Sequence, residues 1–99
     1  MNFLKNLFSQ KQLPEIASVY ALNGETDRLQ GKLKSALQHF DKAIELEPQN
    51  DMYYASRSLV KKDLKDYAGA IKDIEAAISM QESINSYKKI KEEISLSIK

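Results

Sequence analysis

The sequence predicts an all-α fold built from repeated pairs of helices, and three observations support this prediction. The 99 residues include only 3 Gly and 2 Pro, which leaves little turn chemistry for a sheet of many strands. Small and large apolar residues recur at a constant interval along the chain. Within each interval the apolar residues follow a helical period. We therefore expect five main helices and no strand.

The two prolines mark this repeat interval, which is the separation between Pro14 and Pro48. Internal repeats of this length are typical of solenoid architectures. A shift by one repeat interval places small residues on small ones and large apolar residues on large apolar ones. The matched pairs are Tyr20 and Tyr54, Ala36 and Ala70, Leu37 and Ile71, Phe40 and Ile74, Ala43 and Ala77, Ile44 and Ile78, and Leu46 and Met80.

Each unit is predicted to contain two helices joined by a short turn. Apolar residues at positions 70, 71, 74, 77 and 78 lie on one stripe of an α-helix, because their spacing matches the helical period. The first unit repeats this plan, with turns at Gln30-Gly31 and Lys65-Asp66. The expected helices cover residues 15–29, 32–46, 51–64 and 67–80.

Capping residues and small residues support these boundaries. Asn50 or Asp51, and also Asp66, can accept hydrogen bonds from the free backbone N–H groups of a first helical turn. Pro48 opposes continuation of the helix before it, because its ring clashes and it lacks an N–H group. Close crossings of antiparallel helices need small side chains, and we assign that packing role to Gly24, Ala36, Ala43, Ser58, Ala70 and Ala77.

The flanking segments are predicted to close the ends of the array, since a repeat unit buries its apolar face only against a neighbour. Residues 85–99 are expected to form an amphipathic capping helix with a stripe of Tyr87, Ile90, Ile94 and Ile98. The N-terminal segment has its own short stripe of Phe3, Leu4, Leu7 and Phe8. This segment could cap the first unit, dock into the groove of its own or a neighbouring chain, or anchor to a membrane surface. The sequence disfavours the membrane, because such an anchor needs a longer and more basic segment.

The repeat resembles the tetratricopeptide repeat family, whose pattern is an aromatic residue, a Gly four positions later, and then Ala, aromatic, Ala and Pro. The first unit shows this pattern as Tyr20, Gly24, Ala36, Phe40, Ala43 and Pro48, and the second as Tyr54, Ser58, Ala70, Ile74 and Ala77. The segment 67–71 resembles the family's usual opening of the second helix. The departures are Asn23 and Arg57 at a Leu-like position, Ser58 for Gly, Ile74 for the aromatic residue and Glu82 for Pro.

The resemblance covers residues 17–84 and organises the chain as one domain, 1–99. Its expected parts are an N-terminal segment (1–16), repeat 1 (17–50), repeat 2 (51–84) and a capping helix (85–99). In tetratricopeptide arrays the first helices of the units line a concave face that holds a peptide. Carried over by position, this face implies a protein-binding site formed by Ser18, Ala21, Glu25, Arg28, Met52, Ala55, Leu59, Lys62 and Lys89.

The same resemblance implies which peptides suit this face. Family members that bind the C-terminal carboxylate of heat-shock chaperones use Lys and Asn at places that here hold Ala21, Glu25 and Ser56, so that clamp is missing. The expected surface is small and apolar at its centre and charged at its rim. Such a surface suits an apolar helix better than an acidic tail.

No pattern predicts catalysis, a cofactor or a metal. The chain has no Cys, and its single histidine, His39, stands at a position that the family usually exposes and has no partner for a metal or catalytic site. A formal net charge of +1 with interspersed signs argues against nucleic-acid binding. No apolar run approaches the ~20 residues of a spanning helix, and the N-terminus is a poor secretory signal. We therefore expect a cytoplasmic protein.

Two functions are consistent with these features. The leading interpretation is a non-enzymatic adaptor or scaffold that binds a peptide or helix of another protein in the concave groove. The alternative is a self-associating assembly protein, which forms a homodimer through the N-terminal apolar segment or the open end of the array, because exposed apolar patches mark association sites.

Overall fold

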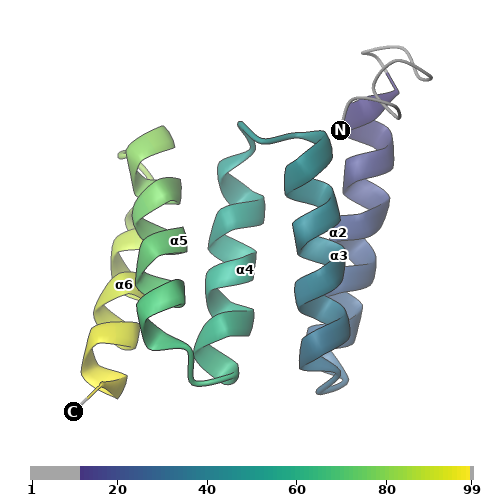
Figure 1. Ribbon diagram of the computed structural model, residues 1–99. Helices are drawn as coiled ribbons and strands as arrows, with labels where there is room; N and C mark the ends of the chain where they lie inside the picture. The colour runs from purple at the N-terminus through teal and green to yellow at the C-terminus, as the bar shows by residue number, and fades with distance from the viewer. Residues whose placement is uncertain (1–11, 99) are drawn as a thin grey trace.

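The computed structural model describes residues 12–98, and within this range the chain forms five helices and no strand. The helices are α2 (Leu13–Leu29), α3 (Leu33–Leu46), α4 (Asp51–Asp63), α5 (Tyr67–Met80) and α6 (Asn85–Ser97). They stand side by side with alternating direction (Figure 1). Helix α2 packs on α3, α4 packs on both α3 and α5, and α6 packs on α5. The predicted all-α repeat fold is confirmed, whereas the stripe from Phe3 to Phe8 lies outside the described residues.

The turns inside the two units have the same geometry. Gly31 and Lys65 are one repeat interval apart, and both have positive φ angles, 78° and 66°. After each of them a backbone N–H donates back across the turn at 2.8 Å, from Lys32 to the Asp27 carbonyl and from Asp66 to the Lys61 carbonyl. This is the Schellman arrangement, which satisfies the last free carbonyls of a helix. Glycine adopts that conformation easily, whereas Lys65 adopts it as a non-glycine residue.

The helix starts follow the capping chemistry expected from the sequence in the second unit. The Asn50 Oδ1 atom accepts from the Met52 N–H at 3.0 Å, and the Asp66 Oδ1 atom accepts from the Gly69 N–H at 3.0 Å. Helix α2 begins two residues earlier than predicted, with Pro14 in its first turn. Proline is tolerated there because the N–H that it lacks has no partner within the helix.

The small residues assigned to the helix crossings are buried as expected. Ala36, Ala43, Ala70, Ala77 and Ser58 are all 0% exposed. The buried Ser58 hydroxyl donates to the Ala55 carbonyl at 2.6 Å. Gly24 is required by packing, since an added Cβ would lie 2.9 Å from the Phe40 ring.

Enlarging these crossings is expected to loosen the helix pairs. We expect Ala36→Leu and Ala70→Leu each to destabilise the chain by roughly 1–3 kcal/mol, the usual cost of overpacking. Thermal unfolding of the two variants would measure the effect, and Ala68→Leu provides an exposed control on α5. Unchanged midpoints in both crossing variants would contradict the close packing of the pairs.

Helix α6 closes the second unit through part of its predicted stripe. Tyr87 and Ile94 are buried, and the Tyr87 hydroxyl donates to the Asp51 carboxylate at 2.6 Å. Ile90 packs against the same core cluster. The assignment of Ile98 to this stripe was wrong, because α6 ends at Ser97 and the Ile98 side chain is 58% exposed.

Candidate functional site

A groove of about 390 Å³ lies between α2 and α4. We call it the α2–α4 groove, and its lining residues are Ala21, Leu22, Glu25, Arg28, Phe40, Met52, Tyr53, Ser56 and Leu59. Two of its large apolar side chains are unusually open to water, since Leu22 is 68% exposed and Met52 is 63% exposed. Grouped exposed apolar side chains of this kind mark binding surfaces on soluble proteins.

The groove follows from the helical period of its two walls. On α2, positions 21, 22, 25 and 28 recur at the spacing that keeps side chains on one face of a helix. On α4, positions 52, 56 and 59 do the same. Small residues at Ala21 and Ser56 keep the middle of the walls low. The buried Phe40 ring from α3 supports the groove from below.

The two basic side chains predicted for this face on α2 and α4, Arg28 and Lys62, are already paired with acids. The Arg28 guanidinium lies 2.7 Å from the Glu25 carboxylate and 3.8 Å from that of Asp63. The hydrogen bond to Glu25, ahead of the two attractive charges, raises the pKa of Arg28. The Lys62 ammonium lies 3.8 Å from the Glu93 carboxylate of α6. Both cations therefore already have an acidic partner within the chain.

The structure brings together five of the nine residues predicted for the concave face: Ala21, Glu25, Arg28, Met52 and Leu59. Lys62 is outside the groove lining and pairs with Glu93 of α6. Ser18 is exposed on α2, where its hydroxyl bonds to the Glu15 carbonyl, outside the groove lining. Lys89 lies in a separate depression on α6 with Leu96.

Ala55 was assigned to the concave face, and the structure does not place it there. Its side chain is 6% exposed and belongs to a core cluster with Ile74 and Tyr87. The reason is that α5 and α6 cover this side of α4. Sequence reasoning also missed Leu22, the most exposed apolar residue of the groove. Its position directly after Ala21 on the same helical face was the available signal.

A second set of polar contacts joins the two helices of each unit at equivalent positions. In the first unit Asp27 on α2 meets His39 on α3, with the Asp27 Oδ2 atom 2.7 Å from His39 Nδ1. In the second unit, one repeat interval later, Lys61 on α4 meets Asp73 on α5 at 3.1 Å. The same site thus holds an acid–base pair in both units, with the acid and the base exchanged between the helices.

The Asp27 carboxylate is held by two neighbours, the Ser35 hydroxyl and the His39 ring. The Ser35 hydroxyl donates to Asp27 Oδ2 at 2.6 Å, and this bond and the contact with His39 lower the pKa of Asp27. Ser35 therefore points to the carboxylate rather than to the imidazole. His39 stands at a position that the family usually exposes, and here its side chain is 31% exposed and its ring lies 6.2 Å from that of Tyr20. Its contacts with Asp27 and Tyr20 on α2 keep the ring only partly exposed.

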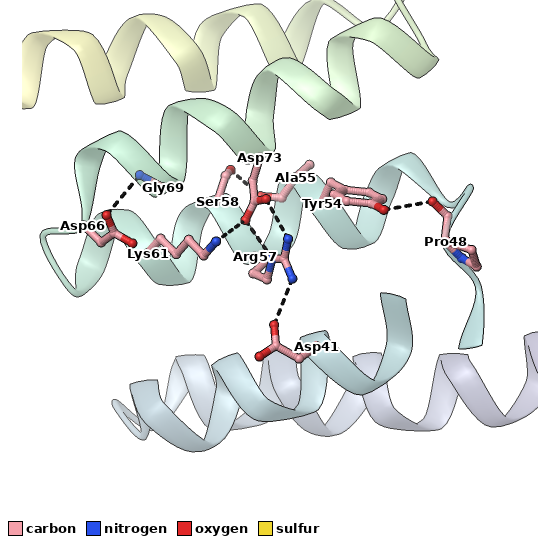
Figure 2. A network of polar contacts seen from close by, with 10 residues as sticks. All are labelled: Asp41, Pro48, Tyr54, Ala55, Arg57, Ser58, Lys61, Asp66, Gly69 and Asp73. Carbon is pink, nitrogen blue, oxygen red and sulfur yellow. Dashed lines mark hydrogen bonds and ion pairs between the residues drawn. The ribbon is translucent and has the colours of Figure 1, made fainter. Parts of the chain in front are cut away.

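Arg57 on α4 connects its own helix to α5 in the second unit and to α3 in the first (Figure 2). Its guanidinium makes two hydrogen bonds to the Asp73 carboxylate on α5, at 2.7 and 2.8 Å. A third, at 2.9 Å, reaches Asp41 on α3. The guanidinium also lies 5.6 Å from the centre of the Tyr54 ring, whose hydroxyl donates to the Pro48 carbonyl. The hydrogen bonds to Asp73 raise the pKa of Arg57. Because Asp73 is 3% exposed, this is a nearly buried ion pair.

Comparison with known proteins agrees with this architecture. A family model described as "Tetratricopeptide repeat" matches residues 17–50 and 53–84. The chain belongs to the tetratricopeptide repeat family. The matched residues include most of α2 to α5, with the Arg57 contacts, whereas Met52 of the groove and all of α6 lie outside them.

Two curated proteins match the repeat region. The chain is 42% identical over 59 residues to "Tetratricopeptide repeat protein 36" of Danio rerio, covering 60% of this chain and 32% of that protein. It is 42% identical over 48 residues to "Small glutamine-rich tetratricopeptide repeat-containing protein 2" of Saccharomyces cerevisiae, covering 48% of this chain and 14% of that protein. The chain thus spans a third or less of the length of these two relatives.

Among solved structures, the first tetratricopeptide domain of Spaghetti (RPAP3), bound to the HSP90 peptide SRMEEVD, has the same fold. The TM-score is 0.83 at 21% identity, with 87% of this chain and 68% of that chain covered. In the part of the chain that the structure describes, no helix is long and apolar enough to cross a membrane.

Proposed function

We propose that this chain is a non-enzymatic interaction module that holds a helix or peptide of another protein in the α2–α4 groove. The observation that supports this function best is the pair of exposed apolar side chains, Leu22 and Met52, on the two walls. Full burial of side chains of this size contributes about 1.5–3 kcal/mol each. With only two walls the groove is short, so we expect an affinity of about micromolar Kd after the costs of association.

The charges of the groove favour an apolar ligand over an acidic C-terminal tail. The HSP90 peptide bound to the Spaghetti domain carries two glutamates and an aspartate near its end. In this chain Glu25 lies in the groove lining, and Arg28 is already paired with it and with Asp63. An incoming carboxylate would have to displace these partners. The ligand that we propose therefore presents apolar anchor side chains at helical spacing, as in helix-in-groove recognition.

The binding test uses a display library of short amphipathic peptides, followed by fluorescence anisotropy with a selected peptide. Leu22→Glu and Met52→Glu place a charge against the apolar anchor and are expected to weaken binding roughly 30-fold or more, because such burial of a charge costs about 2 kcal/mol or more. Leu29→Glu is the matched control, since Leu29 lies on the same helix, is 75% exposed and is outside the groove lining.

Two results would contradict the proposal. One is a selected peptide whose affinity falls equally in the Leu29 and Leu22 variants. The other is binding of the peptide SRMEEVD as tightly as the best apolar peptide. The narrower expectations of a scaffolding role and a cytoplasmic location stay predictions.

A further inference from the structure

The outer face of α2 is exposed where the corresponding faces of α4 and α6 are covered. Val19, Tyr53 and Tyr87 occupy equivalent positions, one repeat interval apart, on these three helices. Tyr53 is 7% exposed in a cluster with Ala43 and Leu46 of α3, and Tyr87 is 6% exposed in a cluster with α5. Val19 is 58% exposed. Within residues 12–98 no helix precedes α2 to cover it.

This outer face is apolar only in its first half. Two turns further along, the equivalent positions on α4 and α6 hold Val60 and Ile94, which are both fully buried. On α2 the same position holds Thr26, which is exposed. Near Val19 the half-buried Tyr20 borders an open cleft of about 650 Å³, which extends over α3 past His39 and Glu45. A covering element for α2 therefore needs only about two helical turns, and the polar second half is left to water.

We propose that the apolar side chains of Phe3, Leu4, Leu7 and Phe8 dock on the first half of this outer face, over Val19 and Tyr20. In a helix the stripe from residue 3 to residue 8 spans about 8 Å at 1.5 Å per residue, which is about one and a half turns. Val19 lies six residues into α2, about 9 Å from its start by the same measure. The apolar stripe and the face it covers therefore match in extent.

The connection to α2 also has the right length. Residues 9–12 separate Phe8 from the start of α2, and residues 47–50 separate α3 from α4. Four residues are thus enough to reverse the chain and lay one helix on the next in this fold. Most helix–helix connections in bundles have about 2–8 residues.

The docked segment is not a further repeat helix in register. A shift by one repeat interval places Asn2, Asn6 and Ser9 where α3 has Ala36, Phe40 and Ala43. The apolar stripe is therefore displaced by one residue. Helix α2 itself starts four residues earlier in the repeat than α4 does, because Leu13 corresponds to Glu47. This extra turn changes where the preceding chain meets the helix, so the docked stripe need not keep the register of α3.

The absence of cysteine from the sequence allows a direct test by disulfide trapping in the full chain. In an antiparallel docking Phe3, about 8 Å before Phe8, lies beside Val19, about 9 Å into α2. One variant therefore carries Phe3→Cys with Val19→Cys. Its matched control carries Phe3→Cys with Leu22→Cys, which lies on the groove side of α2 and is 68% exposed. A disulfide forms only when the two Cβ atoms approach within about 3.5–4.5 Å, so docking on the outer face should make the first pair close at least roughly tenfold faster under mild oxidation.

The products are separated by non-reducing electrophoresis, and circular dichroism checks that both variants fold. A disulfide that forms quickly and within one chain in the Val19 variant supports the proposal. Faster closure in the Leu22 variant would show that the segment fills the groove instead. A cross-linked dimer would assign the segment to a second copy, and equal rates in the two variants would show that it does not dock on either face. Each of these three results overturns the proposal.

Discussion

Replacing Arg57 with Ala is expected to destabilise the chain by roughly 2–4 kcal/mol. Removing one partner of a buried ion pair typically costs about 3–5 kcal/mol, because the other charge stays buried and unpaired. Here the Asp73 carboxylate would lose two hydrogen bonds from Arg57 but would keep Lys61 at 3.1 Å, which places the effect at the lower end. For a domain of this size, each kcal/mol shifts the Tm by roughly 4–8 °C, so thermal or urea unfolding resolves the loss easily.

Three further variants separate this pair from its surroundings. Asp41→Ala removes an acid that is 55% exposed and is expected to cost less than about 1 kcal/mol, as for other surface pairs. Arg57→Leu alone should be as damaging as Arg57→Ala, although it restores the Leu-like character of that position. The double variant Arg57→Leu with Asp73→Leu should recover most of the stability, since apolar replacements of buried pairs are often neutral. An Arg57→Ala protein as stable as the starting chain would show that the pair contributes nothing.

The sequence predicted the helices and turns of this chain closely because both depend on local chemistry that repeats. Gly31 and Asp66 mark the turns by their backbone and capping preferences. The alanines at the crossings mark the close approach of the helices. The start of α2 was placed two residues late, because Pro14 was matched with Pro48, which lies outside a helix, although proline is tolerated in a first helical turn.

The site was harder to predict than the fold. Assigning Ala55 to the concave face took no account of α5 and α6, whose side chains cover it. The polar contacts between helices were missed, because the comparison of the two units considered apolar residues. The signal was present, since Asp27 and His39 stand one repeat interval before Lys61 and Asp73. A search for opposite charges at the repeat interval would have found both pairs.

The stability of the chain is expected to fall steeply above about pH 10 because two tyrosines are buried. Burial, together with the nearby Glu47 carboxylate, raises the pKa of Tyr53 to about 12. Burial and the hydrogen bond to Asp51 raise the pKa of Tyr87 to about 12. Below about pH 10 both phenols are protonated in the folded and the unfolded chain, so they add no pH dependence. Above it the unfolded chain releases these protons while the folded chain retains them, and unfolding is favoured.

At about pH 12 each tyrosine should account for up to roughly 2–3 kcal/mol of lost stability, or roughly 4–6 kcal/mol for the two together. Urea unfolding at a series of pH values from about 8 to about 12 would measure the loss. The double variant Tyr53→Phe with Tyr87→Phe keeps every lysine and arginine, so the difference between the two pH curves isolates the phenols. This variant should start less stable, because Asp51 loses its partner, and its curve should be flatter between about pH 10 and about pH 12. Parallel curves would mean that neither phenol is protected from ionisation by the fold.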